Sequence, residues 1–244
     1  MRAPVRVLRT FRYAVYFDGI NDYAVITDSP SLRITDHITV EALINPVIAT
    51  AWRAIITGKA YTYLLALYDW KIRWYLGTGS TWFLTAITVP ISSYRFSHVV
   101  SNYSKDTGVY QVFVDGSLAH WGSTTPQPIA VNNFGVSVGA AYPPTPALYW
   151  FSGYISAVRI YSRVLGAEEV AHNYSNPGNP ARSGLVLWLQ AHPNYVKDVD
   201  GDGRLEWVDL SGYNNHAKLY GATLVEVVKS PARVLSPARV VPTV

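Results

Sequence analysis

The feature that most constrains the fold of this chain is a succession of short runs of branched, aromatic and other apolar residues. Runs such as YAVYF at 13–17 suit a pleated, half-buried surface. Turn-forming Asp, Gly, Ser and Pro separate the runs, as in the DG pairs at 18–19 and 115–116. Nine strands are predicted in this way, at 13–17, 23–26, 38–44, 63–68, 71–76, 97–103, 110–114, 136–140 and 154–161. Many short strands with regular turns predict an all-β fold, an antiparallel two-sheet sandwich.

The later part of the chain changes character. One short helix is predicted near 166–174, because Glu168 and Glu169 suit a first helical turn and Asn176-Pro177 would end it. A linker-like NPGNPARSG follows at 176–184, and then β-prone runs return at 185–191 and 217–228. The tail repeats SPARVL from residue 230 and echoes APVRVL near the N-terminus. We therefore divide the chain into a sandwich at 1–176, a segment at 177–229 and a Pro- and Arg-containing tail at 230–244.

Composition excludes several classes of protein. The chain has no cysteine, so it has neither disulfides nor a thiolate metal site. No apolar run approaches the roughly 20 residues of a membrane span, so no membrane insertion is expected. The net charge of +4 is concentrated towards the two ends, but no nucleic-acid-binding motif accompanies it, so no nucleic-acid partner is expected. No signal peptide is visible, although the location expected is extracellular or on a virion surface.

Three segments resemble a known family. They are FDGINDYAVITDSPSLRITDHITVEALINP at 17–46, FSHVVSNYSKDTGVYQVFVDGSLA at 96–119 and FSGYISAVRIYSRVLGAEEVAHNY at 151–174. Together they are similar to laminin-G-like, concanavalin A-type jelly-roll domains, over about residues 13–175. The resemblance implies the fold much more specifically than the function, because this fold serves lectins, adhesion modules, hydrolases and coat proteins.

One departure from that family concerns DLSGYNNHAKLYGA at 209–222. In such domains a segment of this kind usually precedes the FDG strand, whereas here it follows the helix. It either folds back to complete the same sandwich, as in a circular permutation, or begins a second copy. About 60 residues are too few for an independent second sandwich, so we favour the fold-back.

The stretch DVDGDGRLEWVD at 198–209 holds five of the chain's 16 acidic residues. Such crowding is unfavourable unless a cation neutralises it. The spacing matches a twelve-residue calcium loop, in which alternate carboxylates, a glycine at position 6 and a backbone carbonyl at position 7 serve a hard cation. The predicted Ca²⁺ ligands are Asp198, Asp200, Asp202, Arg204 through its carbonyl, Glu206 and Asp209. The alternative is an acidic surface turn.

A second metal site is a lesser prediction. Asp18 and Asp22 belong to FDGINDY, and the resemblance implies that this turn often lies near a metal in related domains. The simpler interpretation, which we favour, is a plain turn in which aspartates accept hydrogen bonds from backbone amides.

Aromatic residues near predicted turns raise a sugar-binding hypothesis. Flat exposed rings stack on the apolar faces of sugars, while polar neighbours orient the hydroxyls. The alternative for each ring is core packing. Trp82 is the first choice because it follows GTGS, and the other predicted ligand-binding residues are Trp52, Tyr142 and Trp150.

Enzyme signatures are scarce. The five glutamates do not form the carboxylate cluster that concanavalin-like glycosidases need, and no GxSxG, HExxH or phosphate loop occurs. The sequence thus predicts a non-catalytic, calcium-stabilised module that binds a glycan or a cell-surface polymer. The alternative is a structural subunit of a virion or appendage, a homo-oligomer assembled through its terminal strands, which the repeated tail would extend by strand addition.

Overall fold

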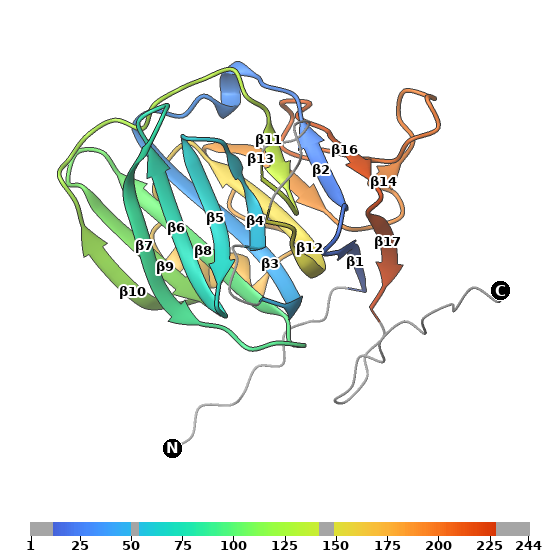
Figure 1. The fold of residues 1–244 in the computed structure, drawn as a ribbon, viewed down its shortest axis with the longest axis horizontal. Helices are drawn as coiled ribbons and strands as arrows, with labels where there is room; N and C mark the ends of the chain where they lie inside the picture. Colours follow the sequence, from blue (N-terminus) through green and yellow to red (C-terminus); the bar gives the residue numbers. More distant parts are fainter. Residues whose placement is uncertain (1–11, 50–53, 142–148, 228–244) are drawn as a thin grey trace.

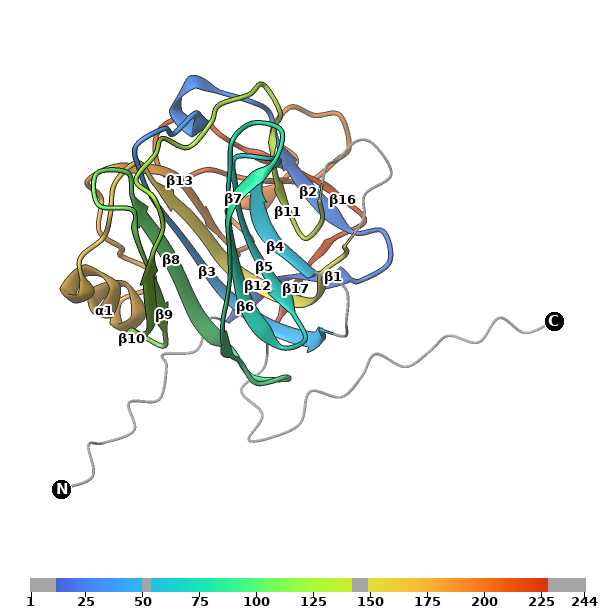
Figure 2. The ribbon, with the colours of Figure 1, turned by 60° about the vertical axis from the view of Figure 1, so that its left-hand side comes forward.

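A computed structural model describes residues 12–49, 54–141 and 149–227. Two antiparallel sheets lie one behind the other in Figure 1, which confirms the predicted jelly-roll sandwich. One helix lies on the outer side of one sheet, beside β9 and β10 (Figure 2). Within these ranges no helix is both long and apolar enough to cross a membrane.

The eight-stranded sheet carries the helix. In spatial order its strands are β10 (Ser117–Ser123), β9 (Val109–Val114), β8 (Ser97–Ser104), β3 (His37–Ile48), β12 (Ser152–Tyr161), β1 (Tyr13–Asp18) and β17 (Thr223–Glu226), and β13 (Leu185–Gln190) also pairs with β12. The helix α1 (Ala167–Ser175) follows β12 in the chain.

The nine-stranded sheet faces it across the core. Its order is β14 (Val196–Lys197), β15 (Glu206–Trp207), β16 (Ala217–Tyr220), β2 (Tyr23–Ile26), β11 (Val136–Val138), β4 (Ala54–Lys59), β5 (Tyr63–Tyr68), β6 (Lys71–Gly77) and β7 (Trp82–Pro90). A short 3-10 helix, η1 (Pro30–Leu32), precedes β3.

Alternation along the strands divides core from surface. On β6, Ile72, Trp74 and Leu76 belong to the main core cluster, whereas Arg73 and Tyr75 point to the outer face. This is the period of two that a pleated strand imposes. Each large apolar side chain buried in this way contributes about 1.5–3 kcal/mol to folding. Alternate residues of these strands thus point into the core between the sheets, and the others point to the outer face.

All nine predicted strands are present, and the predicted helix begins one residue later, at Ala167. Five further strands were not predicted: β4, β7, β10 and the two-residue strands β14 and β15. β7 is apolar with little alternation, and β10 is an edge strand whose side chains are mostly exposed. Asp115 and Gly116 have positive φ angles and form the tight turn that joins β9 to β10. The DG pair at this position could therefore have predicted a hairpin, and with it β10.

The C-terminal segment pairs with strands from the start of the chain. β17 pairs with β1 in one sheet, and β16 pairs with β2 in the other. The loop before β16 is anchored as well, because Asn215 donates to Ser31 Oγ at 2.9 Å and to the carbonyl of Val186 at 2.8 Å. We infer from these contacts that residues 177–227 belong to the same folding unit as the sandwich. The tail at 230–244 lies outside the described residues.

A buried polar network joins α1 to the eight-stranded sheet. Glu41 on β3, which is 1% exposed, accepts hydrogen bonds from His98 Nε2 at 2.8 Å and from Arg159 Nη1 through one carboxylate oxygen. Its other oxygen accepts from Asn173 Nδ2 of the helix at 2.7 Å. Arg159 also donates to the carbonyl of Pro177, just beyond the helix. One carboxylate therefore ties three strands to the helix and to the turn that follows it.

The charge of Glu41 is stabilised despite its burial. Burial alone would raise the pKa of Glu41, but Arg159, His98 and the hydrogen bonds from His98 and Asn173 outweigh that effect and lower the pKa to about 2. Because the folded-state pKa is below the ordinary value of 4.5, this carboxylate stabilises the fold above that value. The contribution is lost as the pH falls from about 4.5 towards 2.

Truncation after Asn176 should prevent stable folding. It removes β13 to β17 and with them the core residues Leu187, Trp207 and Leu219. We expect insoluble protein or a broad, non-cooperative thermal transition, measured by circular dichroism. A variant that ends at Val227 is the control, because it keeps every described strand. A soluble 1–176 fragment with a sharp transition would show that the C-terminal segment is a separate appendage.

Replacing Glu41 by Gln should destabilise the protein by about 3–5 kcal/mol, because it leaves a buried arginine without its counter-charge. Urea unfolding at neutral pH measures this. The control is Glu168→Gln, an exposed helix position, which should change stability by less than about 0.5 kcal/mol. The stability difference between wild type and Glu41→Gln should shrink as the pH is lowered through 4.5 towards 2. A difference that does not depend on pH would contradict the assigned charge state.

Candidate ligand-binding face and acidic loop

The outer face of the nine-stranded sheet carries a second apolar cluster. Its buried members are Ile55, Leu64, Ala66, Tyr75 and Ala141, and Trp82 and Tyr149 pack against it. These residues come from β4 to β7 and from the chain on either side of 142–148. An apolar cluster outside the main core gives this face a shape and an aromatic content that an ordinary solvated sheet face lacks.

Trp82 is the first residue of β7, where it pairs with Gly77. Its side chain is half-buried, with its ring centroid 5.2 Å from that of Tyr75 and 5.7 Å from that of Tyr61. The prediction placed Trp82 in or beside a loop, and the structure places it at the strand end next to the 78–81 turn. It lies in a group of three aromatic rings that come from consecutive hairpins.

A cation lies among the rings of this face. The Arg73 guanidinium carbon is 4.6 Å from the Tyr68 ring centroid and 5.4 Å from that of Tyr75. Arg73 Nε is buried without an acceptor among the described residues. The exposed Thr85, which pairs with Tyr75, adds a hydroxyl nearby. The face therefore combines flat rings with hydrogen-bond donors, which is the chemistry that orients a sugar ring.

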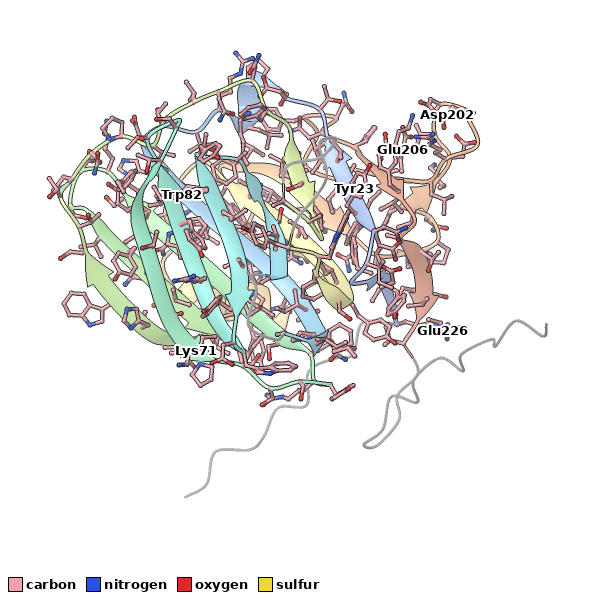
Figure 3. The ribbon with its side chains drawn as sticks, in the orientation of Figure 1. Tyr23, Lys71, Trp82, Asp202, Glu206 and Glu226 are labelled. Atoms are coloured by element: carbon pink, nitrogen blue, oxygen red, sulfur yellow. The ribbon has the colours of Figure 1, made fainter. Side chains whose placement is uncertain are left out.

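The same face continues towards the acidic loop as a row of rings. Trp150 contacts Tyr23 at 5.9 Å between centroids, Tyr23 stacks on Tyr220 at 4.7 Å and 10°, and Arg204 lies 5.0 Å above Tyr220. Figure 3 shows Trp82, Tyr23 and Glu206 at successive places across the sheet, with Asp202 beyond them. Trp52 and Tyr142, the remaining predicted residues, lie outside the described residues.

Other tryptophans divide between core and surface. Trp74 is fully buried in the main core and cannot meet a ligand, as the packing alternative implies. Trp121, on β10 of the opposite sheet, is 64% exposed. Trp121 is more exposed than the half-buried Trp82, so exposure alone does not favour Trp82 as the ligand-binding residue. The neighbours Tyr61, Tyr75 and Arg73 favour it. None of these three was predicted, although Arg73 and Tyr75 alternate with Ile72, Trp74 and Leu76.

The acidic loop brings three of the predicted metal ligands together. One carboxylate oxygen from each of Asp198, Asp200 and Asp202 lies within 4.8 Å of the others, and all three side chains are exposed. Asp198 accepts hydrogen bonds from the Gly201 and Gly203 amides at 2.7 and 2.9 Å, which curls the loop. Three close carboxylates supply the hard oxygen ligands that a divalent cation such as Ca²⁺ prefers.

Lys218 of β16 partly neutralises this group. Its ammonium donates to Asp202 at 2.6 Å and to Asp200 at 3.1 Å. These hydrogen bonds raise the pKa of Lys218, Asp202 contributing most, and they lower the pKa of Asp202. The same carboxylates that fit a metal ion therefore hold a side-chain cation in this structure, and the two would compete.

Of the other predicted ligands, Arg204 carries its guanidinium over Tyr220, and its backbone carbonyl remains a predicted ligand. The two remaining carboxylates are outside the group of three. Glu206 is buried and accepts from the Val199 amide at 3.2 Å. Asp209 is buried too, and its carboxylate accepts from the Trp188, Ser211 and Asn215 amides at 2.8–3.0 Å and from Ser211 Oγ at 2.7 Å. Asp209 thus anchors the 211–215 loop to β13. Its carboxylate is not part of the group of three, so the residue at position 12 of the predicted calcium loop does not join the other carboxylates.

Asp18 and Asp22 form a turn. Asp22 Oδ2 accepts from the Asp18 amide at 2.9 Å, and Asp18 Oδ1 accepts from the Ile20 and Asn21 amides at 2.7 and 3.1 Å. Burial raises the pKa of Asp22. This is the arrangement expected of a plain turn.

Sequence and structure comparisons agree with this architecture. The profile described as "Concanavalin A-like lectin/glucanases superfamily" (Laminin_G_3) matches residues 18–171. The chain belongs to this family. No curated protein matches the chain by sequence.

Solved structures show the same fold at low identity. A putative carbohydrate binding protein from Bacteroides ovatus is similar with a TM-score of 0.70 and 19% identity, over 88% of this chain and 60% of that one. This chain therefore spans only about three-fifths of that protein. Domain 4 of AbnA, a GH43 extracellular arabinanase from Geobacillus stearothermophilus solved with arabinotriose, has a TM-score of 0.50 and 17% identity, over 65% and 75% of the two chains. The Ruminococcus gnavus IT-sialidase CBM40, bound to α2,3 sialyllactose, also has a TM-score of 0.50, with 15% identity over 64% and 95%.

Proposed function

We propose that this protein is a non-catalytic module that binds a glycan on the outer face of its nine-stranded sheet. The observation that carries the proposal is the pair of half-buried rings of Trp82 and Tyr61, with the buried Tyr75 behind Trp82 and Arg73 beside Tyr75. Three proteins of similar fold, a putative carbohydrate binding protein and two that were solved with saccharides, support the same ligand class. The proposed partner is a glycan or a cell-surface polymer. Such a partner implies that the protein acts outside a cell, as a secreted or surface protein.

The rings of this face suit a chain-like ligand. Trp82 lies at β7 and the Trp150–Tyr23–Tyr220 row lies towards the other edge of the same sheet, so a polymer that crosses the strands can meet both. Ala141 and Tyr149, which flank Tyr142 in the sequence, belong to the outer cluster. Ile55, close to Trp52 in the sequence, donates its amide to the carbonyl of Tyr149 at 3.0 Å. We therefore retain Trp52, Tyr142 and Trp150 in the proposed site.

We also propose that Ca²⁺ binds to Asp198, Asp200 and Asp202, with the carbonyl of Arg204 as a further ligand. The fit rests on three exposed carboxylates with close oxygens and on a loop already curled by Asp198. The bound ion would replace Lys218 as the neutralising charge and stabilise the 198–209 loop next to β15 and β16.

The structural subunit of a virion or appendage is the alternative function. β17 is an edge strand of the eight-stranded sheet and precedes the tail with the repeated SPARVL unit. An open edge can accept a strand from a neighbouring chain. This alternative gains support if the glycan experiment fails.

Replacing Trp82 by Ala should weaken glycan binding by about 1 kcal/mol or more, roughly fivefold in Kd, because one stacking ring is lost. Titration of wild type and variant against a broad polysaccharide panel, by calorimetry, measures this. Trp121→Ala is the matched control, because it removes an exposed tryptophan from the other sheet. Equal binding by Trp82→Ala would make the residue assignment wrong. If the wild type binds nothing, the lectin proposal fails and the subunit alternative replaces it.

Chelation of calcium should lower the melting temperature, because an ion that binds only the folded state stabilises it by mass action. Asp200→Ala should remove most of the difference between calcium and chelator, whereas Asp106→Ala, another exposed aspartate, should preserve it. Lys218→Gln should melt earlier in chelator and recover in calcium. Identical melting of metal-free wild type with and without calcium would refute the site.

A further inference from the structure

A cleft on the eight-stranded sheet lies where β12 changes its pairing partner. Ile155 pairs with Val15 of β1, whereas Ala157 pairs with Gln190 of β13. Ser156 between them bonds to both branches: its hydroxyl donates to the Tyr13 carbonyl at 2.9 Å, and its carbonyl accepts from the Ala191 amide at 2.8 Å. An open cleft with a volume of about 380 Å³, here called the fork cleft, lies beside this point and is lined by residues 12–13, 175–179 and 190–192. That volume is within the usual range of small-molecule sites, about 300–1,000 Å³.

The walls of this fork cleft are fixed by hydrogen bonds. Residues 176–179 form one wall as a tight turn, in which the Asn179 amide donates to the Asn176 carbonyl at 2.9 Å. The buried Arg159 holds the carbonyl of Pro177, and His172 Nε2 contacts the carbonyl of Asn179 at 2.9 Å. The opposite wall holds Tyr13 and His192, whose rings meet edge-on at 5.4 Å. The cleft is therefore already formed before any ligand arrives.

The polar groups that line the fork cleft favour a ligand without net charge. Among the described residues that line it there is no carboxylate, and Arg12 is already paired with Glu226 of β17 at 2.7 Å. The cleft lies at the C-terminal end of α1, where the helix dipole is negative and disfavours an anion. What the lining offers is amides from Asn176, Asn179 and Gln190 beside an aromatic ring.

One acceptor in the lining lacks a donor. Gln190 Oε1 is buried and has no hydrogen-bond partner among the described residues. A buried acceptor without a hydrogen bond costs about 1–3 kcal/mol of stability, so its presence in a folded protein needs an explanation. A rotation of the Gln190 side chain that brings this oxygen to the surface of the cleft would let a ligand hydroxyl donate to it.

We propose that the fork cleft is a second binding site, specific for a neutral, hydroxyl-rich ring such as one sugar residue. The apolar face of the sugar packs against Tyr13, and its hydroxyls donate to Gln190 and to backbone carbonyls of the 176–179 turn. The site lies on the eight-stranded sheet and shares no residue with the Trp82 face, so it does not depend on the function proposed for that face. With both sites active, one molecule would hold two points on a polymer.

The test uses two variants of the cleft. Gly178 lines it, has no positive φ, and a Cβ added there would meet no atom within 4 Å, so Gly178→Leu fills the cleft without strain. Gln190→Leu removes the unsatisfied acceptor and should keep or raise the melting temperature. Gly166→Leu, at the other end of α1, where an added Cβ would meet only Glu169 Oε2 at 3.9 Å, is the size-matched control.

The measurement is a titration of the full chain with galactose, glucose, mannose and arabinose, followed by ¹⁵N-resolved spectra, with galacturonate as the anionic comparison. At least one neutral sugar should shift the Gly178 amide and the Gln190 side-chain amide. Gly178→Leu and Gln190→Leu should each weaken that binding roughly tenfold or more. Trp82→Ala and Gly166→Leu should leave it unchanged, which separates this site from the Trp82 face. The proposal is overturned if no neutral sugar shifts these signals, if the shifts persist in Gly178→Leu, or if galacturonate binds better than galactose.

Discussion

The ion pair between Glu41 and Arg159 is the interaction on which the helix-bearing side of the molecule depends. Both groups are buried on the outer face of the eight-stranded sheet, and between them they contact β8, α1 and the carbonyl of Pro177. The chain then turns at 176–179 and returns as β13. A buried ion pair contributes little net stability when its partners are both present, but removal of one partner is costly. Its role here is therefore geometric: it sets where the helix ends and where the returning segment starts.

The fork in the eight-stranded sheet lies in the same region. β12 pairs along its whole length with β3, but on its other side it has two partners in succession, β1 and then β13. β13 returns after the 176–179 turn, whose Pro177 carbonyl Arg159 holds. The two partners meet at Ser156, beside the fork cleft.

The sequence predicted the two-sheet architecture because strand periodicity and turn residues are local signals. It also predicted the helix to within one residue, from Glu168, Glu169 and Asn176-Pro177. What could not be predicted has physical causes. Glu41 is one of the five glutamates that form no catalytic cluster, and its structural role was not predicted, because nothing local in ITVEALI shows that an arginine 118 positions later will neutralise it. Asp209 was counted as a metal ligand because spacing along the chain says nothing about the amides of Trp188 and Asn215 that occupy its carboxylate. Sites that depend on long-range contacts cannot be derived from spacing alone.

The acidic residues of the 198–209 loop fall into two groups, one buried and one exposed. Glu206 and Asp209 are buried and accept hydrogen bonds from backbone amides, so they fix the two ends of the loop on β15 and β13. Asp198, Asp200 and Asp202 are exposed, and only these three have oxygens close enough to share one cation. Lys218 already contacts two of the three, which shows that positive charge is favourable at that position whatever its source. Since Lys218 and Tyr220 lie on the same short strand, replacing the lysine by a metal ion would act directly on the strand whose tyrosine stacks on Tyr23. The carboxylates gathered in one loop of a basic chain thus lie next to the ring row of the proposed glycan face.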